Sequence, residues 1–188
     1  ATPGHAFGSS EDRGVFKTDD GGKTWKNVLY KNEGTGAIDL VMSPKNPDIL
    51  FAALWEFERK AWGAKTGGPD SGVWRSTDGG ESWEEISRNP GLPEGAMGRI
   101  GLTMSADDPD RVYALVDSET QQGLYRSDDL GATWRFEAAW MSDMPVTRTN
   151  GRYTTTSGVN WATGAEFYPG DGDARVVLQL IGTNLVDA

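Results

Sequence analysis

One stretch of the chain places acidic, basic and aromatic side chains close together. Between residues 55 and 62 the sequence carries Trp55, Glu56, Glu58, Arg59 and Trp62. In an extended strand, Glu56 and Glu58 point to the same face, about 6–7 Å apart. Hydrolysis of a glycosidic bond needs two carboxyl groups about 5–10 Å apart, and flat aromatic rings can stack against sugar rings. Glu56 and Glu58 are therefore the candidate catalytic acids of this stretch.

The same stretch has a simpler interpretation. Trp55 can end a core strand, and the charged residues after it can be the solvated side chains of a surface loop. Under that interpretation Trp62 and Arg59 are still candidate ligand-binding residues, because long loops on a rigid sheet often carry binding sites. The loop extends to Ser71, and the sequence leaves both interpretations open.

Two further polar residues are candidates for ligand binding. Asp39 and Arg99 lie in or just before apolar runs that are typical of innermost strands, so their side chains can face a central channel. Each residue can instead form a satisfied polar pair at the rim of a sheet.

Other catalytic and metal-binding chemistries find little support. The chain has no cysteine and one histidine, His5, which disfavours thiolate sites, histidine metal clusters and a Ser-His-Asp triad. A sialidase-type site needs an arginine cluster and a tyrosine nucleophile backed by a glutamate, and the sequence does not assemble one. We therefore predict no metal site and no cofactor.

An eight-residue pattern, Ser/Thr-x-Asp-x-Gly-x-Ser/Thr-Trp, occurs three times and indicates which elements position these residues. Its aspartate can accept hydrogen bonds from the backbone of its own turn, and its glycine can supply a positive φ. Each copy therefore predicts a β-hairpin capped by its own carboxylate. A calcium loop of the EF-hand type would need more oxygen ligands and a closing glutamate. The fixed residues are Asp20, Gly22 and Trp25; Asp78, Gly80 and Trp83; and Asp129, Gly131 and Trp134.

A second repeated phrase precedes two of these hairpins, where residues 38–43 and 49–54 recur as residues 100–105 and 111–115. Together with the hairpins, this gives four strand signals per repeat, which is typical of a β-propeller blade. The predicted strands of the two complete blades lie near residues 38–43, 49–55, 72–76 and 82–87, and near residues 99–105, 111–117, 123–127 and 133–138.

The fold class predicted is all-β, a partial β-propeller of about three to three and a half four-stranded blades with hairpins of this pattern. Residues 1–140 would hold the outer half of one blade and two full blades, and residues 141–188 a divergent or incomplete further blade. In that last segment only residues 175–178 resemble an inner strand. Because closed propellers have about 4–8 blades, the chain is expected to pair with the rest of a larger propeller.

The blade pattern also predicts which loops share an end. Turns between the first and second strands, and between the third and fourth, lie at one end of a blade. The repeated octapeptides belong to that end. The loop at residues 56–71 and the connectors at residues 31–37 and 88–98 lie at the other, where we expect ligands to bind.

The three octapeptides match the Asp-box, or BNR, repeat. With them, residues 14–30, 35–42 and 72–86 resemble sortilin/VPS10-like bacterial BNR-repeat proteins, which are often labelled glycosyl hydrolase-like. The resemblance implies a β-propeller that binds ligands on the rim opposite the Asp boxes or in the central channel. It also implies an extracellular or periplasmic location.

Charge and composition limit the partners. The chain has 18 Lys and Arg against 28 Asp and Glu, a formal net charge of −10, which argues against nucleic acid or an anionic membrane surface as a partner. No apolar run approaches the roughly 20 residues of a membrane span.

Two functions from different classes fit the sequence. The first is a non-catalytic recognition module that binds a peptide, a protein or a glycan on the loop-bearing rim. The alternative is a fragment of a BNR-repeat glycoside hydrolase, xyloglucanase- or sialidase-like, with its catalytic acids partly outside this chain. The motif itself is scaffold, and a propeller hosts unrelated functions.

Overall fold

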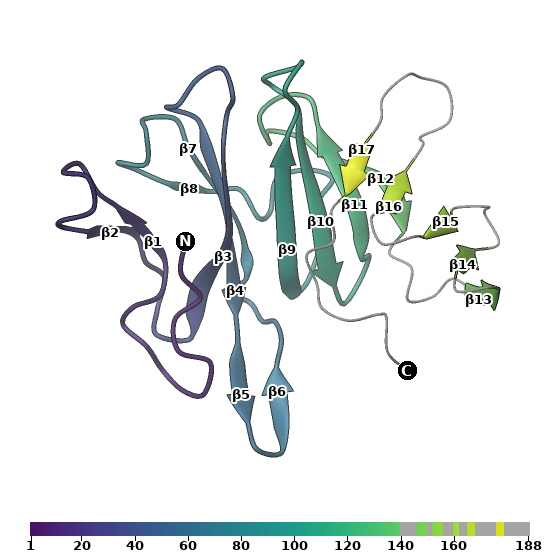
Figure 1. Cartoon of the computed structure of the whole chain (residues 1–188), viewed down its shortest axis with the longest axis horizontal. Coiled ribbons are helices and arrows are strands. Elements are labelled where there is room, and N and C mark those ends of the chain that lie inside the picture. Colours follow the sequence, from purple (N-terminus) through teal and green to yellow (C-terminus); the bar gives the residue numbers. More distant parts are fainter. Residues whose placement is uncertain (140–145, 150–151, 156–159, 162–164, 168–175, 179–188) are drawn as a thin grey trace. The chain divides into compact units, whose positions relative to one another are not determined.

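The computed structural model describes residues 1–139 and, beyond them, five strand segments at residues 146–149, 152–155, 160–161, 165–167 and 176–178 (Figure 1). All regular secondary structure among these residues is β. They contain no helix with the length and hydropathy needed to cross a membrane. The chain divides into two compact units, Ala1–Trp140 and Met141–Ala188.

The first complete sheet, here called blade A, contains four antiparallel strands in the order β3-β4-β7-β8. Val41 of the first strand lies opposite Phe51 of the second, and Phe51 lies opposite Arg75 of the third. The four predicted strands are confirmed, although the last is shorter than expected. Their bounds are β3 (Thr35–Met42), β4 (Leu50–Glu56), β7 (Gly72–Ser76) and β8 (Glu84–Glu85).

The second sheet, blade B, repeats this arrangement in the order β9-β10-β11-β12. Ala114 of its second strand pairs with Leu102 of the first and with Tyr125 of the third. The predicted strands of this blade are confirmed as well. They are β9 (Met97–Met104), β10 (Val112–Ser118), β11 (Gly123–Ser127) and β12 (Arg135–Ala139).

Two shorter hairpins complete the first unit. β1 (Val15–Lys17) and β2 (Lys26–Leu29) form the hairpin of the first Asp box, as predicted. β5 (Glu58–Lys60) and β6 (Gly63–Lys65) form a hairpin within the segment that was predicted to be a loop. Figure 1 shows this second hairpin extending from the sheet of blade A.

The second unit is a five-stranded antiparallel sheet in which each strand pairs with the next along the chain. A strand at Val176–Leu178 agrees with the prediction for that stretch, while residue 175 lies outside the described residues. Its place as an inner strand of a blade stays a prediction. The strands are β13 (Val146–Thr149), β14 (Arg152–Thr155), β15 (Asn160–Trp161), β16 (Ala165–Phe167) and β17 (Val176–Leu178).

Blade A is packed on both faces, because neighbouring residues of a strand point to opposite sides. Phe51 belongs to an apolar cluster shared with Ile100 and Val112 of blade B. Ala52, the next residue, belongs to a second cluster that includes Val15 of the first hairpin. The three sheets therefore stack side by side as consecutive blades.

The blades have two different ends. At one end, the second and third Asp boxes are joined to the preceding turn of their own blade: Gly79 N–H donates to the Asp48 carbonyl and Leu130 N–H to the Asp110 carbonyl, both at 2.9 Å. We call this end the box rim. At the other end, the loop rim, Gly68 N–H donates to the Met97 carbonyl at 3.0 Å. The predicted separation of the Asp boxes from the long loop is confirmed.

Candidate functional site

Each Asp box is a closed set of hydrogen bonds. In the second box, Asp78 accepts bonds from the Ser76 hydroxyl at 2.8 Å, the Ser82 N–H at 2.9 Å and the Ser82 hydroxyl at 2.5 Å. The Ser76 oxygen in turn accepts the Gly80 N–H at 2.8 Å, and the Trp83 indole N–H donates to the Gly80 carbonyl at 3.3 Å. Equivalent contacts surround Asp20 and Asp129, together with Gly22, Trp25, Gly131 and Trp134.

These hydrogen bonds keep the box carboxylates ionised. Backbone and side-chain bonds from Thr24 lower the pKa of Asp20 to about 2. Bonds from Ser82 lower the pKa of Asp78 in the same way. Burial raises the pKa of Asp129, but the bonds from its own turn outweigh burial and leave it lowered. The carboxylates are occupied as turn caps, and no group of three or more His, Cys, Asp or Glu in the described part of the chain is arranged to hold a metal ion.

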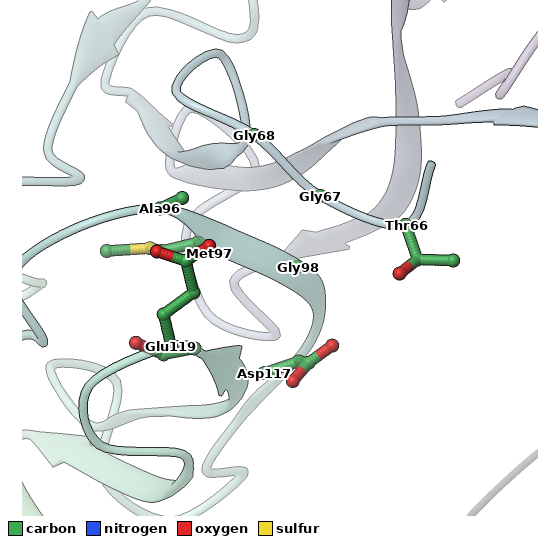
Figure 2. A pocket seen from close by; sticks show the side chains of 9 residues that line it. Thr66, Gly67, Gly68, Ala96, Met97, Gly98, Asp117 and Glu119 are labelled. Atoms are coloured by element: carbon green, nitrogen blue, oxygen red, sulfur yellow. The ribbon is translucent and has the colours of Figure 1, made fainter. Parts of the chain in front are cut away.

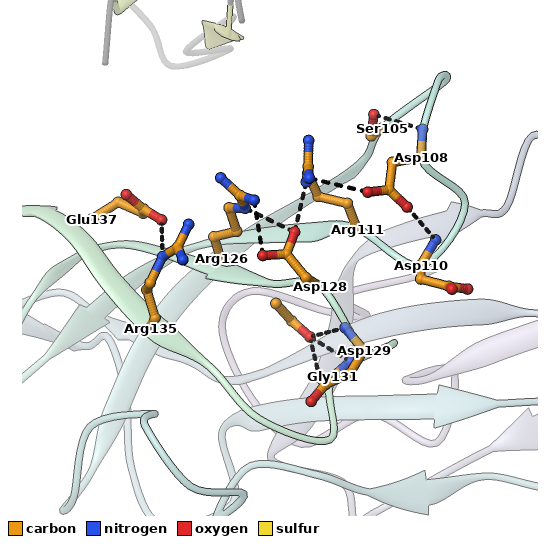
Figure 3. A network of polar contacts seen from close by, with 11 residues as sticks. Ser105, Asp108, Asp110, Arg111, Arg126, Asp128, Asp129, Gly131, Arg135 and Glu137 are labelled. Carbon is orange, nitrogen blue, oxygen red and sulfur yellow. Dashed lines mark hydrogen bonds and ion pairs between the residues drawn. The ribbon is translucent and has the colours of Figure 1, made fainter. Parts of the chain in front are cut away.

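A second charged cluster lies on the box rim of blade B (Figure 3). Asp128 accepts bonds from Arg111 at 2.7 Å and from Arg126 at 2.9 Å, and Arg111 also pairs with Asp108 at 3.0 Å. These partners neutralise one another, so the cluster ties strands of one sheet together and offers little free charge to a ligand.

The candidate functional site is a pocket on the loop rim, with a volume of about 330 Å³. Three short segments line it: Thr66–Gly68 before β7, Ala96–Gly98 at the start of β9, and Asp117–Glu119 at the end of β10. In Figure 2, Ala96–Gly98 runs between the other two segments. Its Met97 carbonyl accepts the Gly68 N–H, and its Ala96 carbonyl accepts the Glu119 N–H at 3.4 Å. The pocket therefore combines parts of blades A and B.

Glycine allows the backbone segments to approach each other this closely. A Cβ atom at Gly98 would lie 2.2 Å from a carboxylate oxygen of Asp117, and one at Gly67 would lie 2.7 Å from the Met97 carbonyl oxygen. The wall of the pocket is thus largely main chain, with the carboxylates beside it.

Asp117 and Glu119 are the charged groups of the pocket. Both residues are exposed, and neither carboxylate makes a hydrogen bond or an ion pair with the described residues. An ionised carboxylate only accepts hydrogen bonds, so this pocket suits a ligand rich in hydroxyl or ammonium donors.

Glu56 lies close to this pocket but already has partners. Its side chain is 14% exposed, forms an ion pair with Lys65 and accepts the Asp70 N–H at 3.5 Å. A Cβ atom at Gly68 would collide with its carboxylate. Glu58 pairs instead with Lys60 at 3.3 Å. The two predicted acids therefore form ion pairs with different lysines. Their role as a catalytic pair stays a prediction.

Trp62 stands at the turn of the hairpin β5–β6 and is 86% exposed. The base of this hairpin is held by aromatic packing and hydrogen bonds. The Trp55 ring stacks on Phe57 with centroids 4.2 Å apart, and its indole N–H donates to the Thr66 carbonyl at 2.9 Å. Since Thr66 also lines the pocket, the hairpin and the pocket share one support.

The structure also places the three other predicted ligand-binding residues, Arg59, Asp39 and Arg99. Arg59 has an exposed side chain, while its backbone N–H donates to the Ala6 carbonyl at 2.8 Å. Asp39 accepts the Leu102 N–H at 2.8 Å, so its carboxylate links two blades. Arg99 is exposed on β9. Ligand contact by any of the three stays a prediction.

Sequence reasoning did not select three residues of this region. Asp117 lies within a correctly predicted strand and Glu119 directly after it, so their position at the loop-rim end of that strand was the available signal. Arg13 is 1% exposed and is enclosed by the N-terminal loop. Its importance depends on contacts with residues far away in the sequence.

No protein-family model matches the sequence. The chain is 28% identical over 144 residues to a xyloglucanase from Paenibacillus sp, an alignment that covers 64% of this chain and 13% of that protein. The chain therefore spans only a small part of the relative's length.

Among solved structures, the chain is similar to an ancestral GH74 enzyme with a TM-score of 0.52 and 18% identity, over 79% of this chain and 22% of that one. The chain folds as part of a β-propeller. A GH74 xyloglucanase from Xanthomonas campestris also matches, with a TM-score of 0.38 and 17% identity over 81% of this chain and 33% of that one. The likeness to the ancestral enzyme concerns the propeller fold alone, and the narrower resemblance to sortilin/VPS10-like proteins stays a prediction.

Proposed function

We propose that this chain is the part of a glycoside hydrolase-like propeller protein that binds a neutral polysaccharide of the xyloglucan type on its loop rim. The relative and the structural neighbours are named as xyloglucanases or GH74 enzymes, which favours a glycan over a peptide or protein ligand. An extracellular or periplasmic location belongs to the same proposal.

The observation that carries this proposal is the exposure of Trp62. An indole ring that is 86% exposed contributes little to the stability of the fold, yet it stands on a hairpin with a defined base. A flat apolar ring that the protein holds in water is suited to stack on the apolar face of a sugar ring. The pocket at the foot of the hairpin can accept the hydroxyl groups of the same ligand.

The charge of the pocket favours a neutral ligand over an anionic one. Asp117 and Glu119 lack cationic partners among the described residues, and the chain as a whole carries a net charge of −10. Uronate or sulfate groups would be repelled, whereas sugar hydroxyls can donate hydrogen bonds to the carboxylates.

Hydrolysis by the whole protein is a second proposal. It is favoured by the names of the relatives and by Asp117, a carboxylate without a partner among the described residues in a concave site. A glycosidase needs two such groups, and the second is proposed to come from Glu119 or from outside this chain.

Isothermal titration of the protein with xyloglucan oligosaccharides tests the binding proposal. Trp62→Ala should weaken binding about three- to tenfold, the worth of one aromatic contact. Trp25→Ala is a matched control, because Trp25 is also exposed, at 59%, but lies on the box rim. Absence of binding by the unaltered protein, or equal losses in both variants, would contradict the proposal. Release of reducing sugar, compared between the unaltered protein and Asp117→Asn, tests the second proposal.

A further inference from the structure

Arg13 is the largest fully buried side chain of the described residues, with 1% of its surface exposed. It lies between the N-terminal loop and β1, and its backbone carbonyl accepts the Asn27 side-chain N–H at 2.9 Å. A Cβ atom at Gly4 would lie only 2.4 Å from its Cγ atom, so the loop is wrapped closely around the arginine.

One nitrogen of the guanidinium joins segments that are far apart in the sequence. Nη2 donates to the carbonyls of His5 at 2.8 Å, Gly8 at 3.1 Å and Phe57 at 3.2 Å. The first two belong to the N-terminal loop, and the third lies at the junction of β4 and β5. Arg13 therefore fastens the start of the hairpin β5–β6 to the N-terminal loop.

The burial of Arg13 is poorly compensated. Its Nε and Nη1 atoms have no hydrogen-bond partner among the described residues, and no carboxylate there pairs with it. Burial lowers the pKa of the guanidinium, and the nearby charge of Glu58 partly opposes that effect. A buried charge with unused donors destabilises a fold unless it is paired, so stability alone does not account for an arginine at this position.

The contacts of Arg13 lead directly to the exposed tryptophan. Phe57, whose carbonyl it holds, stacks on Trp55, and two residues later the Arg59 N–H donates to the Ala6 carbonyl at 2.8 Å. The hairpin is thus fixed to the N-terminal loop at two points, through Arg13 at Phe57 just before β5 and directly at Arg59 within β5. Trp62 follows at the turn of the same hairpin.

We propose that Arg13 is a positioning residue that fixes the hairpin β5–β6 and thereby holds Trp62 where its ring meets a glycan. The effect of Arg13 on ligand binding rests on the proposed glycan-binding function. Its other effect, fixation of the hairpin, can be measured without any ligand.

Limited proteolysis with trypsin measures the fixation directly, because the hairpin contains Arg59, Lys60 and Lys65 as cleavage sites. Arg13→Met should increase the cleavage rate at these sites about tenfold, since local opening becomes easier when the hairpin loses a fixed contact. Arg13→Lys retains a charged donor for the carbonyls and should restore much of the protection. An equal rise at Arg111 and Arg126 in blade B would mean general destabilisation and would overturn the proposal.

Arg75→Met is the matched control. Arg75 also donates from its guanidinium to a carbonyl, that of Leu130 at 2.9 Å, and also has an Nε atom without a partner among the described residues. It acts on the box rim, so its removal should leave cleavage in the hairpin unchanged. Faster cleavage of the hairpin in this variant would count against a specific role for Arg13.

A double-mutant cycle connects Arg13 to the ligand. Arg13→Met should weaken binding of xyloglucan oligosaccharides about three- to tenfold, by adding the cost of ordering the hairpin on binding. In the Trp62→Ala background the same change should have no further effect, because Arg13 acts through that ring. Independent, additive losses would overturn the proposal. If the unaltered protein binds no glycan, the proposed function fails, and the proteolysis result still decides whether Arg13 fixes the hairpin.

Discussion

The carboxylate of Asp39 accepts a 2.8 Å hydrogen bond from the backbone N–H of Leu102 and so joins the innermost strands of two neighbouring blades. Its other oxygen accepts the Leu40 N–H at 2.9 Å. In the repeated phrase, the position of Asp39 is occupied by Gly101 in blade B. The link is therefore particular to the boundary between blades A and B, which is also the boundary that forms the pocket.

Replacement of Asp39 by alanine should destabilise this boundary. Leu102 is buried, so its N–H would lose its acceptor in a place that water reaches poorly. We expect a loss of about 1–3 kcal/mol in the free energy of unfolding, measured with urea. Asp19→Ala is the control, because Asp19 is exposed and makes only a 3.9 Å ion pair with Lys17. Equal stability of the two variants would contradict a structural role for the Asp39 carboxylate.

The glycines of the Asp boxes should differ in their tolerance of alanine. Gly22 and Gly131 have φ values of 89° and 83°, so each substitution carries a backbone cost of about 1 kcal/mol. At Gly22 an added Cβ would meet nothing nearer than the Trp25 ring at 3.8 Å. At Gly131 it would lie 2.7 Å from Ile86, whose side chain is fully buried and has little room to move.

Gly131→Ala should therefore lose about 2–4 kcal/mol of unfolding free energy, and Gly22→Ala about 1 kcal/mol. Thermal and urea unfolding of the two variants provide the comparison. The order of the two losses is the decisive result, since a larger loss at Gly22 would be incompatible with this packing.

The Asp boxes should make stability dependent on acid. The pKa of Asp20 is lowered to about 2 in the folded protein, against about 3.9 in an unfolded chain. A lowered folded-state pKa contributes stability that is present above the unfolded value and is lost as the pH falls toward the folded value. The thermal midpoint should thus fall between about pH 4 and pH 2, and less steeply in Asp20→Asn than in the unaltered protein. Parallel curves for the two proteins would contradict this assignment, and Asp19→Asn serves as the control.

Local patterns were enough to predict most of the blades. The octapeptide fixes its own turn through hydrogen bonds among neighbours such as Thr18, Asp20 and Thr24, so it can be read without knowledge of the rest of the fold. The apolar phrase around Phe51 likewise predicts a buried strand, because both faces of that strand are covered.

Features that depend on distant contacts were not predictable in the same way. The strand Gly63–Lys65 is short and exposed and has no apolar alternation, so only its pairing with Glu58–Lys60 defines it. Arg13 resembles an ordinary loop arginine until the Phe57 carbonyl is brought to it by the fold. The pocket could not be predicted from the sequence either, because three segments that are separate in the sequence form it.

The pocket should discriminate between ligands by charge. Asp117 and Glu119 would repel a carboxylated oligosaccharide of the same length as a neutral one, and we expect at least about tenfold weaker binding for the charged ligand at low salt. The difference should shrink above about 0.1 M salt, where the Debye length is about 10 Å or less. It should also shrink in the Asp117→Asn, Glu119→Gln double variant. Titration calorimetry measures the affinity in each case. Tighter binding of the charged ligand would contradict binding beside Asp117 and Glu119.

The two acids selected from the sequence should respond differently to neutralisation. Glu56 is largely buried, pairs with Lys65 and lies against Gly68, whereas Glu58 is only partly buried and its partner Lys60 is exposed. Glu56→Gln should therefore cost about 1 kcal/mol of unfolding free energy, and Glu58→Gln less than about 0.5 kcal/mol.

The same two variants separate a structural role for Glu56 from a catalytic one. A general acid or base contributes about 10²–10⁴-fold to a rate, so removal of a catalytic carboxyl would nearly abolish hydrolysis by a protein that still binds its glycan. Glu56 is already paired with Lys65. We therefore expect Glu56→Gln to lower turnover only through its small loss of stability. A fall in turnover of a hundredfold or more at unchanged affinity would instead make Glu56 a catalytic residue and the ion pair with Lys65 part of its chemistry.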